Sequence, residues 1–240
     1  MSRIVSSVLV LSGLMLSELA LAHVSFVKDV NNVPASGRSI VATLNIPHGC
    51  HDSAGKSYDT NKIEVKLPTD VQLSSVMPMH STFGKAKLLK DNTGKITTLV
   101  WEQKAEEKQD SDSHLYQVSF RVTLAKKNTD NTTTALAPFT TLGFETTQYC
   151  GDSNQLSEIW TGADIPTLYI VPTRSSGWNK YTVPSALDLT GKGKNFFTDA
   201  AIVWKDKEGH SANTNTLELI KKNATELKQI PAGGTVWVKY

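Results

Sequence analysis

The strongest constraint on the fold is a hydrophobic repeat of two residues, which recurs in short runs along the chain. In residues 62–67 (KIEVKL), every second side chain is apolar and the others are lysine or glutamate. Residues 39–46 and 115–124 repeat the pattern and are rich in β-branched and aromatic residues. Alternation of this kind is typical of half-buried β-strands, because successive side chains of a strand point to opposite faces of its sheet. The sequence therefore predicts sheets with one buried face.

Polar turn sequences separate these runs at short spacing. The segment KDNTGK (90–95) lies between the apolar residues 88–89 and the run 96–101, which predicts a β-hairpin. The charged run 104–113 is expected to be a solvated loop before the next strand. Short strands joined by polar turns are typical of an antiparallel β-sandwich, and we predict an all-β fold of this type.

The composition changes after Gly162, where prolines interrupt short apolar segments. A helix is predicted further on, with a cap at Thr214 or Asn215. Its apolar face would consist of Leu217, Ile220, Ala224 and Leu227. The tail 235–240 (TVWVKY) predicts a final strand. Because few apolar residues are available for a separate core, we expect residues 163–240 to form a small mixed extension or subdomain rather than an independent domain.

The first 22 residues have the pattern of a secretory signal peptide. Arg3 supplies a positive charge, residues 4–16 are mostly apolar, and the tripeptide ALA at 20–22 fits a cleavage signal. We expect cleavage just before His23 and a periplasmic or secreted protein. No later apolar run approaches the roughly 20 residues that span a bilayer, so the mature chain is expected to lack a transmembrane segment.

Charge and motif content limit the functions to be considered. The chain has 25 Lys and Arg against 23 Asp and Glu, a formal net charge of +2. A chain so close to neutral gives no basis for a basic phosphate-binding face, and we expect no nucleic-acid partner. The sequence contains no GxSxG, no HExxH and no phosphate-binding loop. We therefore predict that the protein is not an enzyme.

The two cysteines, Cys50 and Cys150, both lie in the part of the chain that would be exported. An oxidising compartment favours a disulfide between them, and neither a CxxC motif nor a Cys/His spacing indicates zinc. The alternative is that both thiols are metal ligands. We predict the disulfide.

Cleavage before His23 would leave a histidine with a free α-amine at the start of the mature chain. The amine and the ring Nδ1 can then close a chelate on a metal, and imidazole suits Cu, Zn, Fe and Ni. The reference pKa of an α-amine, about 7.7–8.0, allows a metal to displace its proton near neutral pH. The alternative is that this histidine has no role.

Four segments occur in an order that resembles the YcnI-type copper-binding domain family. They are HVSF (23–26), PHGCHDS (47–53), NKIEVKLPTDV (61–71) and ETTQYCGDSNQLSEIWTG (145–162). The resemblance spans residues 23–162 and implies an exported β-sandwich of immunoglobulin- or fibronectin-like character. It also implies that the mature N-terminal histidine binds Cu(II) in a mono-histidine brace, helped by a carboxylate and a nearby tryptophan. Carried over to this sequence, the histidine is His23 and the tryptophan is Trp160.

The carboxylate departs from the family pattern. Where the family has an acid directly after the proline of an LPxxV turn, this chain has Thr69. Asp70 follows one position later, and we take it as the candidate ligand. Glu64, on the charged face of the preceding strand, and Glu158, close to Trp160 in sequence, remain alternatives.

A second group of copper donors lies outside the resemblance. Met77 and Met79, in VMPMH (76–80), are the only methionines after residue 22. With His80 they combine thioether and imidazole donors, which suit Cu(I). We favour the simpler interpretation that the methionines fill gaps in the core at a proline-bent strand end. His48 and His51 flank Cys50, and we interpret them as polar residues of the disulfide loop, with metal ligation by either as the alternative. The sequence around His114 and His210 indicates no site.

The sequence thus predicts an exported protein that sequesters or hands over Cu(II), with a copper chaperone or a membrane copper transporter as its partner. Two alternatives remain open. A copper-dependent oxygenase acting on a polymer would need a second histidine beside His23 and a flat aromatic surface, and the five tryptophans are scattered along the chain. An immunoglobulin-like binding or adhesion module would make no use of the histidine.

Overall fold

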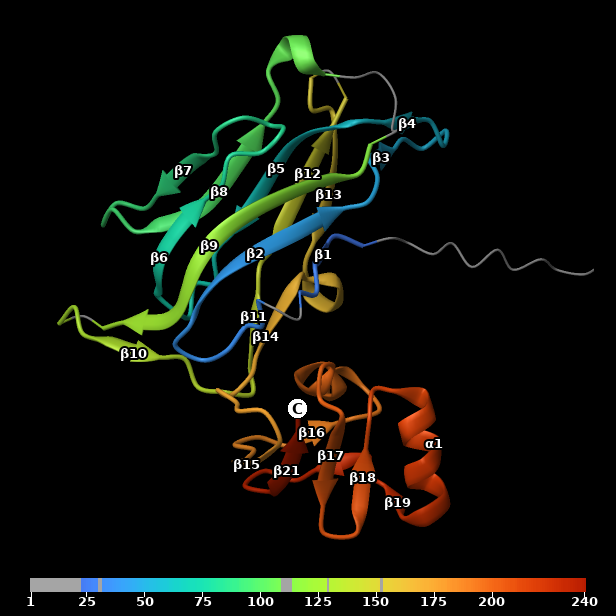
Figure 1. Ribbon diagram of the computed structural model, residues 1–240. Coiled ribbons are helices and arrows are strands. Elements are labelled where there is room, and N and C mark those ends of the chain that lie inside the picture. Colours follow the sequence, from blue (N-terminus) through green and yellow to red (C-terminus); the bar gives the residue numbers. More distant parts are fainter. Residues whose placement is uncertain (1–22, 30–31, 109–113, 129, 152) are drawn as a thin grey trace, which may run out of the picture.

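The computed structural model describes residues 23–29, 32–108, 114–128, 130–151 and 153–240 (Figure 1). The signal peptide expected at residues 1–22, and therefore its cleavage site, lie outside these residues. In the described part of the chain, no helix has the length and apolar character needed to cross a membrane.

Two five-stranded sheets of described residues form the larger part of the molecule, and their strands pair antiparallel throughout. The first sheet consists of β1 (Ser25–Phe26), β2 (Ser39–Ile46), β6 (Leu73–Pro78), β9 (Tyr116–Lys127) and β10 (Thr133–Ala135). The second consists of β5 (Thr60–Lys66), β7 (Lys87–Lys90), β8 (Ile96–Glu102), β12 (Thr146–Cys150) and β13 (Leu156–Trp160). The expected hairpin is the β7–β8 pair, and the predicted alternating runs correspond to β2, β5 and β9.

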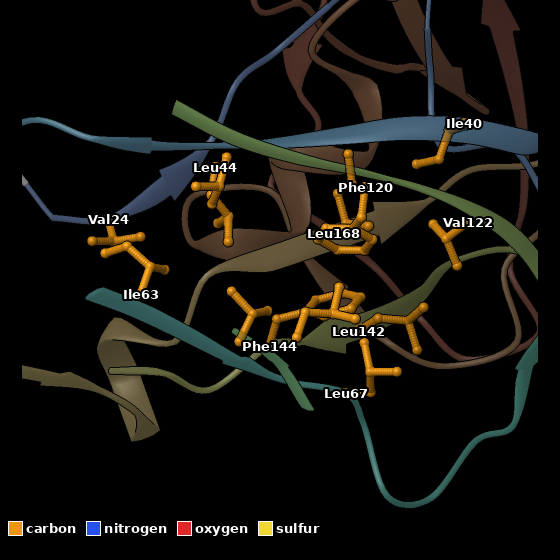
Figure 2. Close-up of a cluster of buried hydrophobic side chains, with 14 of the residues drawn as sticks. Val24, Ile40, Leu44, Ile63, Leu67, Phe120, Val122, Leu142, Phe144 and Leu168 are labelled. Atoms are coloured by element: carbon orange, nitrogen blue, oxygen red, sulfur yellow. The ribbon is translucent and has the colours of Figure 1, made fainter. Parts of the chain in front are cut away.

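Alternate side chains of these strands meet in one core between the two sheets. On β2, for example, Ile40, Ala42, Leu44 and Ile46 are buried, while the residues between them are exposed or half-buried. Figure 2 shows part of this cluster, in which Phe120 of the first sheet and Ile63 of the second take part. The molecule is therefore an antiparallel β-sandwich with a smaller C-terminal part, as the alternation predicted.

The sandwich continues past residue 162, the boundary expected from the sequence. Strand β14 (Thr167–Ile170) pairs with β11 (Thr140–Gly143), and Leu168 and Ile170 are buried in the sandwich core. The C-terminal part begins after this strand.

The C-terminal part forms a smaller lobe beyond one end of the sandwich, with its own buried residues (Figure 1). Its main sheet has the order β15 (Trp178–Thr182), β21 (Thr235–Lys239), β17 (Ile202–Lys205), β18 (Glu208–His210) and β19 (Thr225–Glu226). The helix α1 (Thr214–Asn223), the 3-10 helix η3 (Lys192–Phe197) and the pair β16 (Leu187–Asp188) and β20 (Gln229–Ile230) complete it. Of the thirteen described residues in its buried cluster, Phe139 and Val171 come from segments adjoining the sandwich, so the two cores adjoin at these residues.

The predicted helix is shorter than its apolar pattern indicated. Asn213, rather than Thr214 or Asn215, caps it, because the Asn213 side chain accepts a hydrogen bond from the backbone N–H of Thr216. The helix ends at Asn223. Leu227 lies beyond it, where its buried side chain belongs to the C-terminal core instead of the helix face.

The predicted disulfide is present and connects Cys50 to Cys150, which are 100 residues apart in sequence. It joins β3 (Cys50–His51), which pairs with β4 (Ser57–Tyr58), to the end of β12. Both cysteines are buried. The disulfide therefore links the connection between β2 and β5 to β12, an interior strand of the second sheet.

We expect the double variant Cys50→Ala/Cys150→Ala to lose about 2–5 kcal/mol of unfolding free energy, because the bridge restricts a long loop in the unfolded chain. Denaturant titration against the parent measures this difference. Thiol labelling of the unreduced parent after unfolding should find no free thiol. Two reactive thiols would contradict the disulfide.

Candidate metal centre

His23 is held in place by the residue that follows it. Val24 is 1% exposed and lies in the sandwich core (Figure 2). The next two residues form β1, which pairs with the end of β2 at Leu44 and Asn45. Since side chains alternate along an extended chain, burial of Val24 turns the His23 ring outward. The His23 side chain is 42% exposed.

The ring of His23 packs against Trp160, the last residue of β13. The two ring centroids are 5.1 Å apart and the planes are nearly perpendicular, at 83°. The indole is 8% exposed, so the histidine lies at the rim of the core. The indole Nε1 is buried and has no hydrogen-bond partner among the described residues. A donor of this kind is normally satisfied, and it marks a place where an acceptor fits.

A carboxylate reaches the same ring from the segment after β13. Asp164 lies in the 3-10 helix η2 (Gly162–Asp164), and its Oδ1 is 4.0 Å from Nε2 of His23. Gly162 has a positive φ of 58°, which favours glycine and turns the chain back beside the strand end. No atom lies within 4 Å of a Cβ added there, so the conformation, rather than the available space, calls for glycine in the WTG sequence.

The structure does not bring Asp70 to this position. Asp70 is exposed on the connection between β5 and β6. Strand β6 pairs with β9 on the side away from β2, whereas β1 pairs with β2, so β6 and β1 are at opposite edges of the first sheet. The acid beside His23 is Asp164, which sequence reasoning missed although it lies only four residues after Trp160.

The other two candidate acids, Glu64 and Glu158, lie beside other residues. Glu64 forms an ion pair with Lys62 at 3.0 Å and accepts a hydrogen bond from the Tyr149 hydroxyl at 3.2 Å. These partners explain its place on the charged face of β5. Glu158 is half-buried on β13, two residues before Trp160, and is paired in register with Gln148.

The groups that contact His23 among the described residues are the Trp160 indole and the Asp164 carboxylate. Among the described residues there is no group of three or more His, Cys, Asp or Glu side chains that could hold a metal ion. A brace formed by an α-amine and one imidazole needs fewer side-chain donors than such a group. The Asp164 carboxylate supplies a negative charge beside this ring.

The methionines do not fill the core, so our favoured interpretation of them was wrong. Met77, on the edge strand β6, and Met79, which follows the end of β6 at Pro78, are 48% and 45% exposed. His80 beside them is also exposed.

The remaining histidines lie elsewhere. His48 and His51 have ring centroids 5.9 Å apart near the disulfide, and His114 lies 3.8 Å from the buried Asp59 carboxylate. Burial lowers the pKa of His210, which favours the neutral ring in the C-terminal part. In the described part of the chain, the ring and ion-pair contacts of His23 are with Trp160 and Asp164, and none is with a second histidine.

We predict that Asp164→Asn weakens Cu(II) binding to the chain starting at His23 by about tenfold, or 1.4 kcal/mol, because it removes the negative charge beside the imidazole. Asp70→Asn is the matched control, an exposed acid in another connection, and should leave the affinity unchanged, as should Glu64→Gln. Competition titration with a chromophoric Cu(II) chelator measures the affinities. Weaker binding from Asp70→Asn alone would contradict the assignment of Asp164.

Comparison with known proteins gives distant structural likenesses. No family model matches the chain, and no curated protein matches it. One similar structure is an uncharacterized protein from Nocardia farcinica described as having an immunoglobulin-like fold. The identity is 16%, the match covers 62% of this chain and 98% of that chain, and the TM-score is 0.45. Another is the Actinomyces fimbrial adhesin FimA, with 13% identity, coverage of 90% of this chain and 77% of that chain, and a TM-score of 0.29.

Proposed function

We propose that the protein is exported, binds Cu(II) at a mature N-terminal His23, and sequesters the ion or hands it to another copper protein. The observation that carries this proposal is the position of the His23 ring, between the indole of Trp160 and the carboxylate of Asp164. The disulfide is consistent with an oxidising, extracytoplasmic compartment. The family resemblance in the sequence gives copper as the metal.

The two ring nitrogens of His23 would have different tasks. Nδ1 is the nitrogen nearer the main chain, and it can close a chelate together with the α-amine. Nε2 is the nitrogen that faces Asp164 at 4.0 Å, a separation longer than a hydrogen bond. A metal-bound histidine commonly donates its other N–H to a carboxylate, which fixes the orientation of the ring. Asp164 would therefore orient the imidazole and balance charge, and would not itself need to be a ligand.

Trp160 would shape the site from the core side. Its indole packs nearly perpendicular to the imidazole, and its buried Nε1 has no hydrogen-bond partner among the described residues. The side chains of His23 and Asp164 remain 42% and 57% exposed. An exposed site with few protein donors suits uptake and transfer of an ion better than permanent storage. The proposed partner is an exported copper chaperone or a membrane copper transporter.

Placing one alanine before His23 should weaken Cu(II) binding by more than about tenfold, because an amide nitrogen replaces the α-amine as the donor. The comparison is between this extended protein and the protein starting at His23, with His23→Ala as a control that removes the ring. Equal affinities of the first two would exclude the terminal amine. If His23→Ala also bound equally well, the site would lie elsewhere, with Met77, Met79 and His80 as the next candidates.

Bound Cu(II) should quench the fluorescence of Trp160 more than that of the other four tryptophans, because paramagnetic quenching decreases with distance. Titrating the parent and Trp160→Phe with Cu(II) separates this contribution. We expect the variant to lose most of the quenching while keeping its fold, which far-UV circular dichroism checks. Unchanged quenching in Trp160→Phe would place the ion away from the indole.

A further inference from the structure

Three of the five tryptophans lie on one face of the C-terminal sheet, although they are far apart in sequence. Trp237 of β21 pairs in register with Lys180 of β15 on one side and with Trp204 of β17 on the other. Residues paired across a sheet point to the same face. Trp178 is paired with Lys239, two positions along β21 from Trp237, and therefore points to that face as well. We call this surface the tryptophan face.

The tryptophan face is the outer face of its sheet. The intervening residues Val203, Val236 and Val238 are buried in the C-terminal core. Trp178 and Trp237 consequently remain 50% and 46% exposed. Two large, half-exposed indoles on one small sheet form an unusual apolar surface, and such surfaces commonly mark binding sites.

The third indole is fixed in place and extends the surface sideways. Nε1 of Trp204 donates a hydrogen bond to the carbonyl of Asp206 at 2.9 Å. The ring lies over Gly209 of β18, where an added Cβ would be 2.5 Å from its Cζ3 atom. Gly209 thus leaves the space that the ring occupies. Lys180, Trp237, Trp204 and Gly209 are paired in register in one row. The row crosses the neighbouring strands β15, β21, β17 and β18 (Figure 1).

The row ends in a hollow beside α1. This open hollow of about 630 Å³ is lined by Ile202 and Trp204 of the sheet and by Leu219 and Ile220 of the helix, among others. Leu219 is 61% exposed. The row and the hollow together form an elongated apolar path, which fits a linear ligand better than a compact one.

The charges at the Trp178 and Trp237 end of the face are positive, whereas Asp206 lines the hollow at the other end. At the outward-facing positions of β15, β21 and β17, the charged residues are Lys180 and Lys239, and no acid occurs there. The Lys180 ammonium lies 5.7 Å from the centre of the Trp237 ring. Thr182 and Thr235, paired at the end of the face, add exposed hydroxyl groups. The surface thus combines aromatic rings, cations and hydroxyls.

We propose that the tryptophan face binds a chain of an anionic polysaccharide, such as a polymer that contains uronic acids. The C–H faces of pyranose rings stack on indoles, the carboxylates of the polymer pair with Lys180 and Lys239, and sugar hydroxyls bond to the threonines. A flat row on a sheet supports a polymer along its length. Indoles and lysines can also meet a membrane surface, and the vesicle measurement below separates that ligand from a polymer.

The test is affinity electrophoresis of the protein starting at His23, without copper, in gels containing polygalacturonate or, for comparison, neutral dextran. We expect polygalacturonate to retard the parent more strongly than dextran does. Trp237→Ala should weaken the binding by about tenfold, in the range of tryptophan residues at binding hot spots. Trp237→Phe, which keeps an aromatic ring, should retain most of it. Lys180→Gln/Lys239→Gln should remove the preference for the charged polymer.

Matched controls lie on β7 of the sandwich. Leu89→Ala removes a side chain that is 48% exposed, and Lys90→Gln removes an exposed cation; neither should alter the retardation. Absence of retardation in the parent, or equal retardation of the parent and Trp237→Ala, would overturn the proposal. Binding to phosphatidylglycerol vesicles without binding to polygalacturonate would also overturn it and assign the face to a membrane surface. His23→Ala should bind the polymer normally, so the result is independent of the copper proposal.

Discussion

The structure depends on the burial of every second side chain along its strands. Packing one set of side chains between two sheets fixes the direction of the other set, because a strand cannot turn a single residue over without shifting its register. Ile40, Ala42, Leu44 and Ile46 of β2 show the buried set most completely. Surface chemistry is therefore arranged by the core beneath it, and both proposed sites illustrate this.

At the amino terminus, the buried side chain of Val24 fixes the direction of the neighbouring His23. Full burial of a valine side chain contributes about 1.5–3 kcal/mol, and Phe26 of the two-residue strand β1 adds ring contacts with Phe120 and Phe144. With Val24 in the core, His23 is held at the edge of Trp160. Gly162 then turns the chain so that Asp164 reaches the imidazole. Three short sequence elements, HV, W and GAD, thus meet although Trp160 lies 137 positions after His23.

In the C-terminal part, the same alternation of buried and exposed side chains produces an apolar surface. Val236 and Val238 alternate with Trp237 along β21, so burial of the valines exposes the tryptophan. The neighbouring strand repeats this with Val203 and Trp204. An exposed tryptophan lowers solubility and adds nothing to the buried core. A binding role therefore explains the exposed tryptophans better than a contribution to stability does.

The sequence by itself determined the strands, because their alternation is a local signal, and it determined the disulfide, because only one pair of cysteines exists. It also pointed to His23 and Trp160 through short motifs. Only the tertiary structure decided which acid lies beside the histidine. The connection with Asp70 leads to β6, at the sheet edge opposite β1, whereas Asp164 follows β13. It also exposed Met77 and Met79 and gathered Trp178, Trp204 and Trp237 on one face. Strand pairing between distant segments decides such neighbours, and no local pattern encodes which strands will pair.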